Sequence, residues 1–164
     1  MTLSAHAIVG AGIAAAMPAH PLLGITLAFG SHFLVDAVPH RDYRVRSLSL
    51  HPDFGHPFGF NKDLLLDLAT IGLDLAFGLT LAIVLFATIA SPSLILIAAF
   101  VGTLPDAVHL LDPRWKHEPV ITFQKIHRAI QNEPALLEDR PFLGIFLQIV
   151  FVSVIVIFLK TIAL

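Results

Sequence analysis

The chain has 164 residues, 56% of them hydrophobic, and a strongly positive mean hydropathy. This composition predicts one domain and favours an integral membrane protein over a soluble one. Cysteine is absent, the net charge is −2 and the basic residues form no stripe, so the composition excludes disulfides and thiolate metal ligands and gives no indication of nucleic-acid binding.

Apolar stretches separated by charged or proline-rich segments predict an all-α fold, a membrane bundle of about five transmembrane helices that fills residues 1–164. The stretches are residues 3–17, 22–38, 64–90, 94–111 and 142–163. Short turns near 18–21 and 91–93 join the first four stretches into two helical hairpins. The second long polar connection is expected to carry a short amphipathic helix from Val120 to Gln131.

Basic residues concentrate in the two long polar connections and are absent from the two short turns. They are Arg41, Arg44, Arg46 and Lys62 in the first connection, and Arg114, Lys116, Lys125, Arg128 and Arg140 in the second. Because alternate loops face the same side, the positive-inside rule places both long connections and the N-terminus in the cytoplasm, and the C-terminus outside.

Histidine is in excess, with nine residues against ten lysines plus arginines. The histidines and aspartates of the predicted helices, except the deeper Asp74, gather at helix ends that the alternation places on one side of the membrane. They are His6; His32, Asp36 and His40; Asp63 and Asp67; and Asp106, His109 and Asp112. His127 lies in a connection on the same side and could join them. The sequence therefore predicts a cluster of imidazoles and carboxylates at the cytoplasmic face.

The most specific local pattern is His32 with Asp36, because residues four apart share one face of a helix and can hold one ion or bridge two. His40 lies four residues further on, but Pro39 is expected to end or bend the helix and turn His40 out of line. An aspartate within an apolar helix costs a few kcal/mol unless it is paired or hydrated. The alternative is a hydrogen-bonded pair that only joins helices.

Asp106 and His109, three residues apart, form a second pair on one helical face. Imidazole and carboxylate donors without thiolate suit a divalent transition metal, zinc first and manganese or iron as alternatives, in a site of one to three ions. The alternative for this pair is a solvated contact or a helix cap. The alternative to metal binding for His6 is that it is a single histidine at the membrane interface. For His127 the alternative is a place on the polar face of a surface helix.

Asp67 and Asp74 lie seven residues apart on one face of the third predicted helix. Either could orient a metal-binding imidazole by accepting its other ring N–H. Asp74, the deeper of the two, could instead belong to a proton path.

Three segments carry a family resemblance, namely residues 1–6 (Met-Thr-Leu-Ser-Ala-His), 30–36 (Gly-Ser-His-Phe-Leu-Val-Asp) and 104–109 (Leu-Pro-Asp-Ala-Val-His). They resemble motifs of the bacterial YdjM-like family of inner-membrane metal-dependent hydrolases. The family's His-Arg-Gly-x-Thr-His-Ser segment has only a partial counterpart at 126–129, and the Ser-His-x-x-x-Asp helix comes early in the chain. The helix is also similar to one in soluble zinc-dependent phospholipases C. The resemblance implies a bacterial inner-membrane hydrolase with metal-site residues His6, His32, Asp36, Asp106 and His109.

These patterns favour metal-dependent hydrolysis of a phosphoester or related bond, in a lipid or other amphiphile that reaches the site from the cytoplasmic leaflet. Asp36 is positioned to bridge two ions, and Asp106 or Asp42 is the candidate base. Arg41, Arg44 and Arg128 are candidates for binding an anionic headgroup. Two other functions remain open: an ion or proton transporter that uses the His/Asp cluster, and a non-catalytic membrane adaptor.

Overall fold

The computed structural model describes residues 1–42, 61–109, 117–131, 134, 137 and 139–163, and the side chain of His109 lies outside this description. This part of the chain is helical and has no strand, which confirms the all-α prediction. Its helices are α1 (Leu3–Ala15), α2 (Pro21–Asp36), α3 (Lys62–Phe86), α4 (Pro92–His109), α5 (Val120–Ile130) and α7 (Pro141–Ala163). Each predicted apolar stretch contains one helix, and the predicted amphipathic helix is α5.

Local signals explain where several helices begin. Asn61 caps α3, because its side chain accepts a hydrogen bond of 2.8 Å from the backbone N–H of Leu64. Pro21 opens α2, and Pro141 opens α7. Proline is favoured at this first position because its fixed φ suits a helix and its missing N–H would have no helical partner there.

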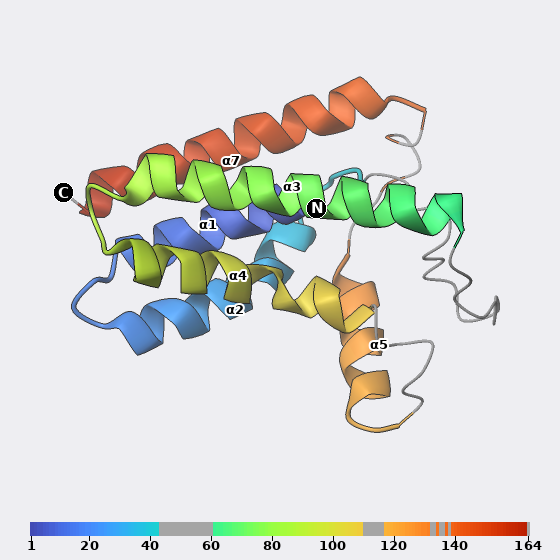
Figure 1. Cartoon of the computed structure of the whole chain (residues 1–164), viewed down its shortest axis with the longest axis horizontal. Helices are drawn as coiled ribbons and strands as arrows, with labels where there is room; N and C mark the ends of the chain where they lie inside the picture. Colours follow the sequence, from blue (N-terminus) through green and yellow to red (C-terminus); the bar gives the residue numbers. More distant parts are fainter. Residues whose placement is uncertain (43–60, 110–116, 132–133, 135–136, 138, 164) are drawn as a thin grey trace.

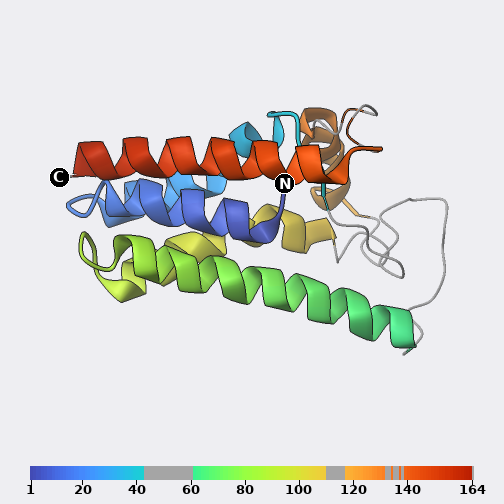
Figure 2. The ribbon, with the colours of Figure 1, turned by 90° about the horizontal axis from the view of Figure 1, so that it is seen from above.

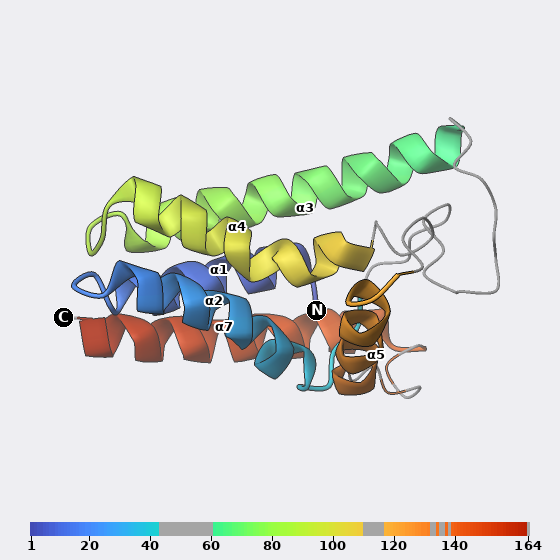
Figure 3. The ribbon, with the colours of Figure 1, turned by 90° about the horizontal axis from the view of Figure 1, so that it is seen from below.

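Helix α1 lies at the centre of the bundle. It packs against α2, α3, α4 and α7, and most of its residues are buried. Figure 2 shows α7, α1 and α3 side by side, and Figure 1 shows α2 and α4 on the other side of α1. Helix α5 crosses the end of the bundle beside the last turns of α2 and α4 (Figure 3). The start of α1 and the ends of α2 and α4 therefore meet at the same end of the molecule.

Small residues allow α1 to approach its neighbours closely. A Cβ atom added at Gly10 would lie 2.8 Å from the carbonyl oxygen of Ala98 on α4. At Gly78 on α3 it would lie 2.5 Å from Cα of Ser4, and at Gly24 on α2 it would lie 2.9 Å from Cα of Ala14. Backbone contacts of this kind are typical of helices that associate through small residues. They hold the polar starts and ends of these helices within reach of one another.

The expectation of about five transmembrane helices is wrong for the described residues. Only α3 and α7, with 25 and 23 residues, are long and apolar enough to cross a membrane. Helices α1 and α2 have 13 and 16 residues. At 1.5 Å per residue they reach roughly 20–24 Å, less than the hydrocarbon thickness of roughly 30 Å. The predicted stretches included turn residues, such as Met17 and Val38, that do not continue the helices.

We predict that Gly10→Ala destabilises the fold by about 1–3 kcal/mol, because the added methyl group meets the backbone of α4. Gly72→Ala is the matched control, because a Cβ atom at that position has no neighbour within 4 Å. Thermal unfolding of both variants can be followed by circular dichroism in detergent. The midpoint temperature of unfolding should be lower than that of the wild type only for Gly10→Ala. Equal midpoints for the two variants would disprove the close contact between α1 and α4.

Candidate metal centre

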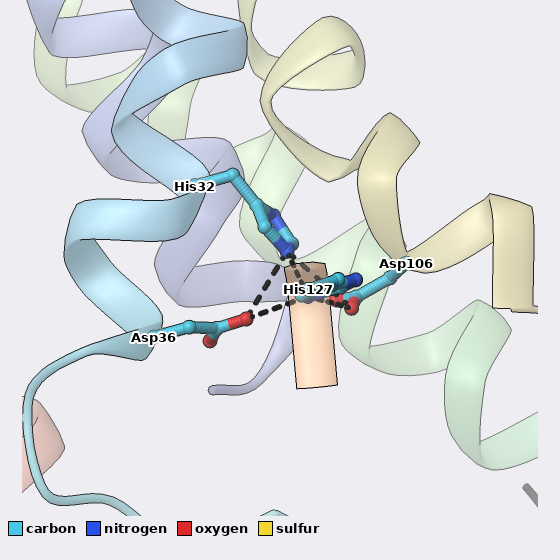
Figure 4. A group of neighbouring side chains, drawn as sticks. All are labelled: His32, Asp36, Asp106 and His127. Carbon is cyan, nitrogen blue, oxygen red and sulfur yellow. Dashed lines mark hydrogen bonds and ion pairs between the residues drawn. The ribbon is translucent and has the colours of Figure 1, made fainter. Parts of the chain in front are cut away.

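Four side chains from three helices converge at the end of the bundle crossed by α5. They are His32 and Asp36 on α2, Asp106 on α4 and His127 on α5 (Figure 4). Each residue offers one nitrogen or oxygen donor, and the four donor atoms lie within 4.8 Å of one another. This group could hold a metal ion.

The donor atoms lie from 3.0 to at most 4.8 Å apart, a range that includes the spacing of a tetrahedral site. Nε2 of His32 and Nε2 of His127 are 3.0 Å apart, and they lie 3.1 and 3.0 Å from Oδ2 of Asp36. Oδ1 of Asp106 is 3.5 Å from the His32 nitrogen and 3.8 Å from the His127 nitrogen. With zinc bonds of about 2.0–2.2 Å, a tetrahedral site separates its donors by roughly 3.3–3.5 Å. The two imidazole nitrogens and Oδ2 of Asp36 would have to move apart by a few tenths of an ångström to accommodate an ion.

A hydrogen bond to the backbone sets the orientation of His32. Its Nδ1 lies 2.9 Å from the carbonyl oxygen of Gly102 on α4. A carbonyl oxygen can only accept, so Nδ1 carries the proton and a neutral ring presents a lone pair at Nε2. Metal-binding histidines commonly have their tautomer fixed in this way. The contact therefore directs the free nitrogen of His32 at Asp36, Asp106 and His127.

Helix periodicity explains why these side chains meet. The spacing of four places His32 and Asp36 on one face of α2, and both are fully buried. On α5 the buried side chains are Gln124 and His127, three residues apart, so the polar side of this amphipathic helix faces the site. The ring of Phe33 packs edge-on against His127 at 5.5 Å between centroids. Asp106 keeps 28% of its side chain exposed, so it is the least buried of the four donors.

His6 and His40 also approach Asp36. His6, on α1, stacks on His32 with 3.8 Å between ring centroids, and its Nε2 lies 3.1 Å from Oδ1 of Asp36. Helix α2 ends at Asp36, as Pro39 predicted, but the chain turns back and brings Nε2 of His40 to 3.9 Å from the same oxygen. Nδ1 of His40 donates to the carbonyl of Val38 at 2.8 Å, which fixes its ring as well.

Asp42 forms the outer side of the cluster. Its carboxylate oxygens lie 3.6 Å from Nε2 of His40 and 3.1 Å from the amino group of Met1, which also lies 2.5 Å from Oδ1 of Asp36. Burial alone would raise the pKa of Asp42, but the hydrogen bond with His40 and the positive amino group outweigh it and lower the pKa to about 2. Asp42 is therefore ionised at neutral pH and stabilises positive charge nearby.

The remaining predicted residues occupy varied positions. Asp67 is buried, and its expected role in orienting an imidazole stays a prediction. Asp74 accepts a hydrogen bond of 3.2 Å from the backbone N–H of Ser4, so it holds the first turn of the helix that carries His6. Arg41 donates to the carbonyl of Leu137 at 2.9 Å, and Arg128 is exposed on α5 beside His127. Arg44 and the side chain of His109 lie outside the described part of the chain.

Gln148 on α7 has a structural role that the sequence analysis did not predict. Its side chain accepts a hydrogen bond of 3.3 Å from the backbone N–H of Thr2 and donates to the carbonyl of Arg41. It thereby joins the segment before α1 to the segment that carries His40 and Asp42. A glutamine in the apolar first half of α7 was the available signal, since buried polar groups need partners.

Comparison with protein-family models, with curated proteins and with solved structures gave no match. The resemblance to the YdjM-like family therefore stays a prediction that rests on three short segments.

We predict that Gln148→Leu lowers the free energy of unfolding by about 1–3 kcal/mol, because it leaves two partly buried backbone groups without their partner. Ser153→Ala, at an exposed position of the same helix, should leave stability unchanged. Chemical unfolding in detergent measures both effects. If the two variants were equally stable, Gln148 would not support this segment.

Proposed function

We propose that this chain is a membrane-bound, metal-dependent hydrolase of a phosphoester or related bond, possessing a zinc site at the cytoplasmic face of a bacterial inner membrane. The observation that carries the proposal is the convergence of His32, Asp36, Asp106 and His127 from three helices. Their mixed imidazole and carboxylate donors suit zinc, with manganese or iron as alternatives.

The exposure of the two long apolar helices supports a membrane location. Only 11% of the apolar window of α3 and 17% of that of α7 are buried inside the protein. The core helix of a soluble protein is mostly buried, whereas these helices expose large side chains such as Leu73, Phe77 and Phe146. A lipid bilayer would cover this surface. The basic residues of the long connections favour placing the polar end at the cytoplasmic side.

The distribution of buried polar groups favours a one-sided site over a transport path. Among the described residues, the buried polar side chains lie in the half of each helix nearest α5 or in the adjoining loops. They are His6, Ser31, His32, Asp36, His40, Asp67, Thr103, Gln124, His127 and Gln148. An ion path would need polar groups in the opposite half as well. Hydrolysis needs them only where substrate and water meet.

In hydrolysis, a water oxygen bonds to phosphorus, the bond to the leaving oxygen breaks, and that oxygen takes up a proton. A bound divalent ion would lower the pKa of the attacking water and stabilise negative charge on the phosphoryl oxygens. Asp36 has no exposed surface and is suited to holding the site together. Asp106 is partly exposed beside the site and is therefore the better placed base, with Asp42 as the alternative.

Basic side chains near the site would favour an anionic substrate. Arg41 precedes Asp42 and is partly exposed, and Arg128 adjoins His127 on the exposed side of α5. Guanidinium groups bind phosphate with paired hydrogen bonds. A lipid phosphoester would present such a headgroup at the level of this cluster while its acyl chains stay in the bilayer. This is the substrate class that the arrangement favours.

We predict that purified protein contains bound transition metal and that His32→Ala lowers metal affinity at least about tenfold, since even groups that only orient a ligand contribute this much. His20→Ala is the control, because His20 is exposed and lies in the turn between α1 and α2, away from the site. Elemental analysis measures the metal that each purified variant retains. Hydrolysis of bis(p-nitrophenyl) phosphate measures the activity, which His32→Ala should lose together with the metal. Metal-free wild-type protein that folds normally would contradict the proposal.

We also predict that the protein stays in the membrane fraction after an alkaline carbonate wash and is released only by detergent. The apolar surfaces of α3 and α7 are the physical reason. Immunoblotting of the washed fractions measures the distribution. Quantitative release into the carbonate supernatant would disprove integral membrane insertion.

A further inference from the structure

In Asp36 and Asp106, one carboxylate oxygen lies near His32 and His127 and the other oxygen lies toward His6. Oδ2 of Asp36 and Oδ1 of Asp106 lie near His32 and His127, as described above. The other oxygen of each carboxylate faces His6: Oδ1 of Asp36 is 3.1 Å from Nε2 of His6, and Oδ2 of Asp106 is 4.0 Å from it. His6 therefore completes a second donor set that shares both carboxylates with the first.

His6 is buried without a well-aligned hydrogen bond at either ring nitrogen. Its side chain is 1% exposed, Nδ1 has no hydrogen-bond partner, and Nε2 has only the close contacts with the carboxylates of Asp36 and Asp106. Burying an imidazole without hydrogen bonds costs free energy, and such groups in native proteins usually indicate an unseen partner. A metal ion at Nε2 would provide that partner.

The stacking of His6 on His32 matches the spacing of paired ions. The two rings are 3.8 Å apart at their centroids and only 21° from parallel. Both direct Nε2 at the same carboxylate, Asp36. Two-metal sites that hydrolyse phosphoesters hold their ions about 3.5–4 Å apart. Nearly parallel imidazoles at this separation can each bind one ion of such a pair.

We propose that the centre holds two divalent ions bridged by Asp36 and Asp106, with His32 and His127 on the first ion and His6 on the second. The proposal rests on the metal centre of the proposed function and extends it. With both oxygens of Asp106 on metal, the alternative candidate Asp42 would be the base. Oδ1 of Asp36 also contacts the amino group of Met1, but a carboxylate oxygen has two lone pairs and can serve both partners. With fewer protein donors, the second ion keeps positions open for water and for a phosphoryl oxygen, as catalytic sites do.

Two measurements on the full-length protein in detergent test the proposal. Elemental analysis should find two ions per wild-type chain, two in the His20→Ala control and one in His6→Ala. After the metal is removed and Mn²⁺ is added, electron paramagnetic resonance should show the spin-coupled signal of a bridged pair in the wild type. The His6→Ala variant should show only an isolated Mn²⁺ ion.

The number of bound ions separates failure of the two-ion proposal from failure of the proposed metal centre. One ion in the wild type would overturn the second position and leave the hydrolase proposal intact, whereas no ion would overturn both. Two ions in His6→Ala, or two uncoupled Mn²⁺ ions in the wild type, would overturn the assignment of the donors. His6→Phe keeps a ring against His32 without a nitrogen donor and should also lose one ion, so it serves if His6→Ala does not fold.

Discussion

The polar end of this bundle depends on one buried carboxylate. Asp36 has no exposed surface, and its two oxygens contact His6, His32, His127 and the amino group of Met1 at 2.5–3.1 Å. A charged group away from water is costly unless positive charge and hydrogen-bond donors surround it. The start of α1, the end of α2 and helix α5 must therefore meet at this point. A metal ion bound to Asp36 would also provide positive charge that offsets the cost of burying this carboxylate.

Small residues make this meeting geometrically possible. Helices come into close van der Waals contact where small residues lie at their crossing points. Gly10 and Gly102 let α1 and α4 approach until backbone atoms touch, and a Cβ atom at Gly102 would lie 2.9 Å from the carbonyl oxygen of His6. The same approach places the Gly102 carbonyl where it can orient His32. Packing and site geometry are therefore one feature of the molecule.

The exposure of one donor bears on the kind of metal site that the cluster could form. A structural metal site surrounds its ion with protein donors, whereas a catalytic site retains a position for water. Here three of the four donors are buried and Asp106 is partly exposed, at the end of the molecule that also holds Arg41 and Arg128. The opposite halves of the described helices hold no buried polar side chain, so the buried polar groups gather at one end.

Hydropathy and residue spacing determined much of this structure in advance. Apolar stretches predicted each of the long helices to within a few residues at most ends, because burial in lipid or protein requires continuous apolar sequence. Alternation of the helices predicted that their imidazoles and carboxylates would gather at one end, and the spacing of four placed His32 beside Asp36. These features depend on local periodicity and on the order of the elements.

Tertiary packing alone decided the rest. The lengths of α1 and α2 depend on where the turns close, and so only α3 and α7 reach membrane-spanning length. The distances from His127, His6 and His40 to Asp36 depend on how α5, α1 and the loop after α2 pack, which no residue spacing encodes. Asp74 and Gln148 bind backbone groups of distant segments for the same reason. Local sequence sets which donors each helix carries, and only the packing of helices sets which atoms come within bonding distance.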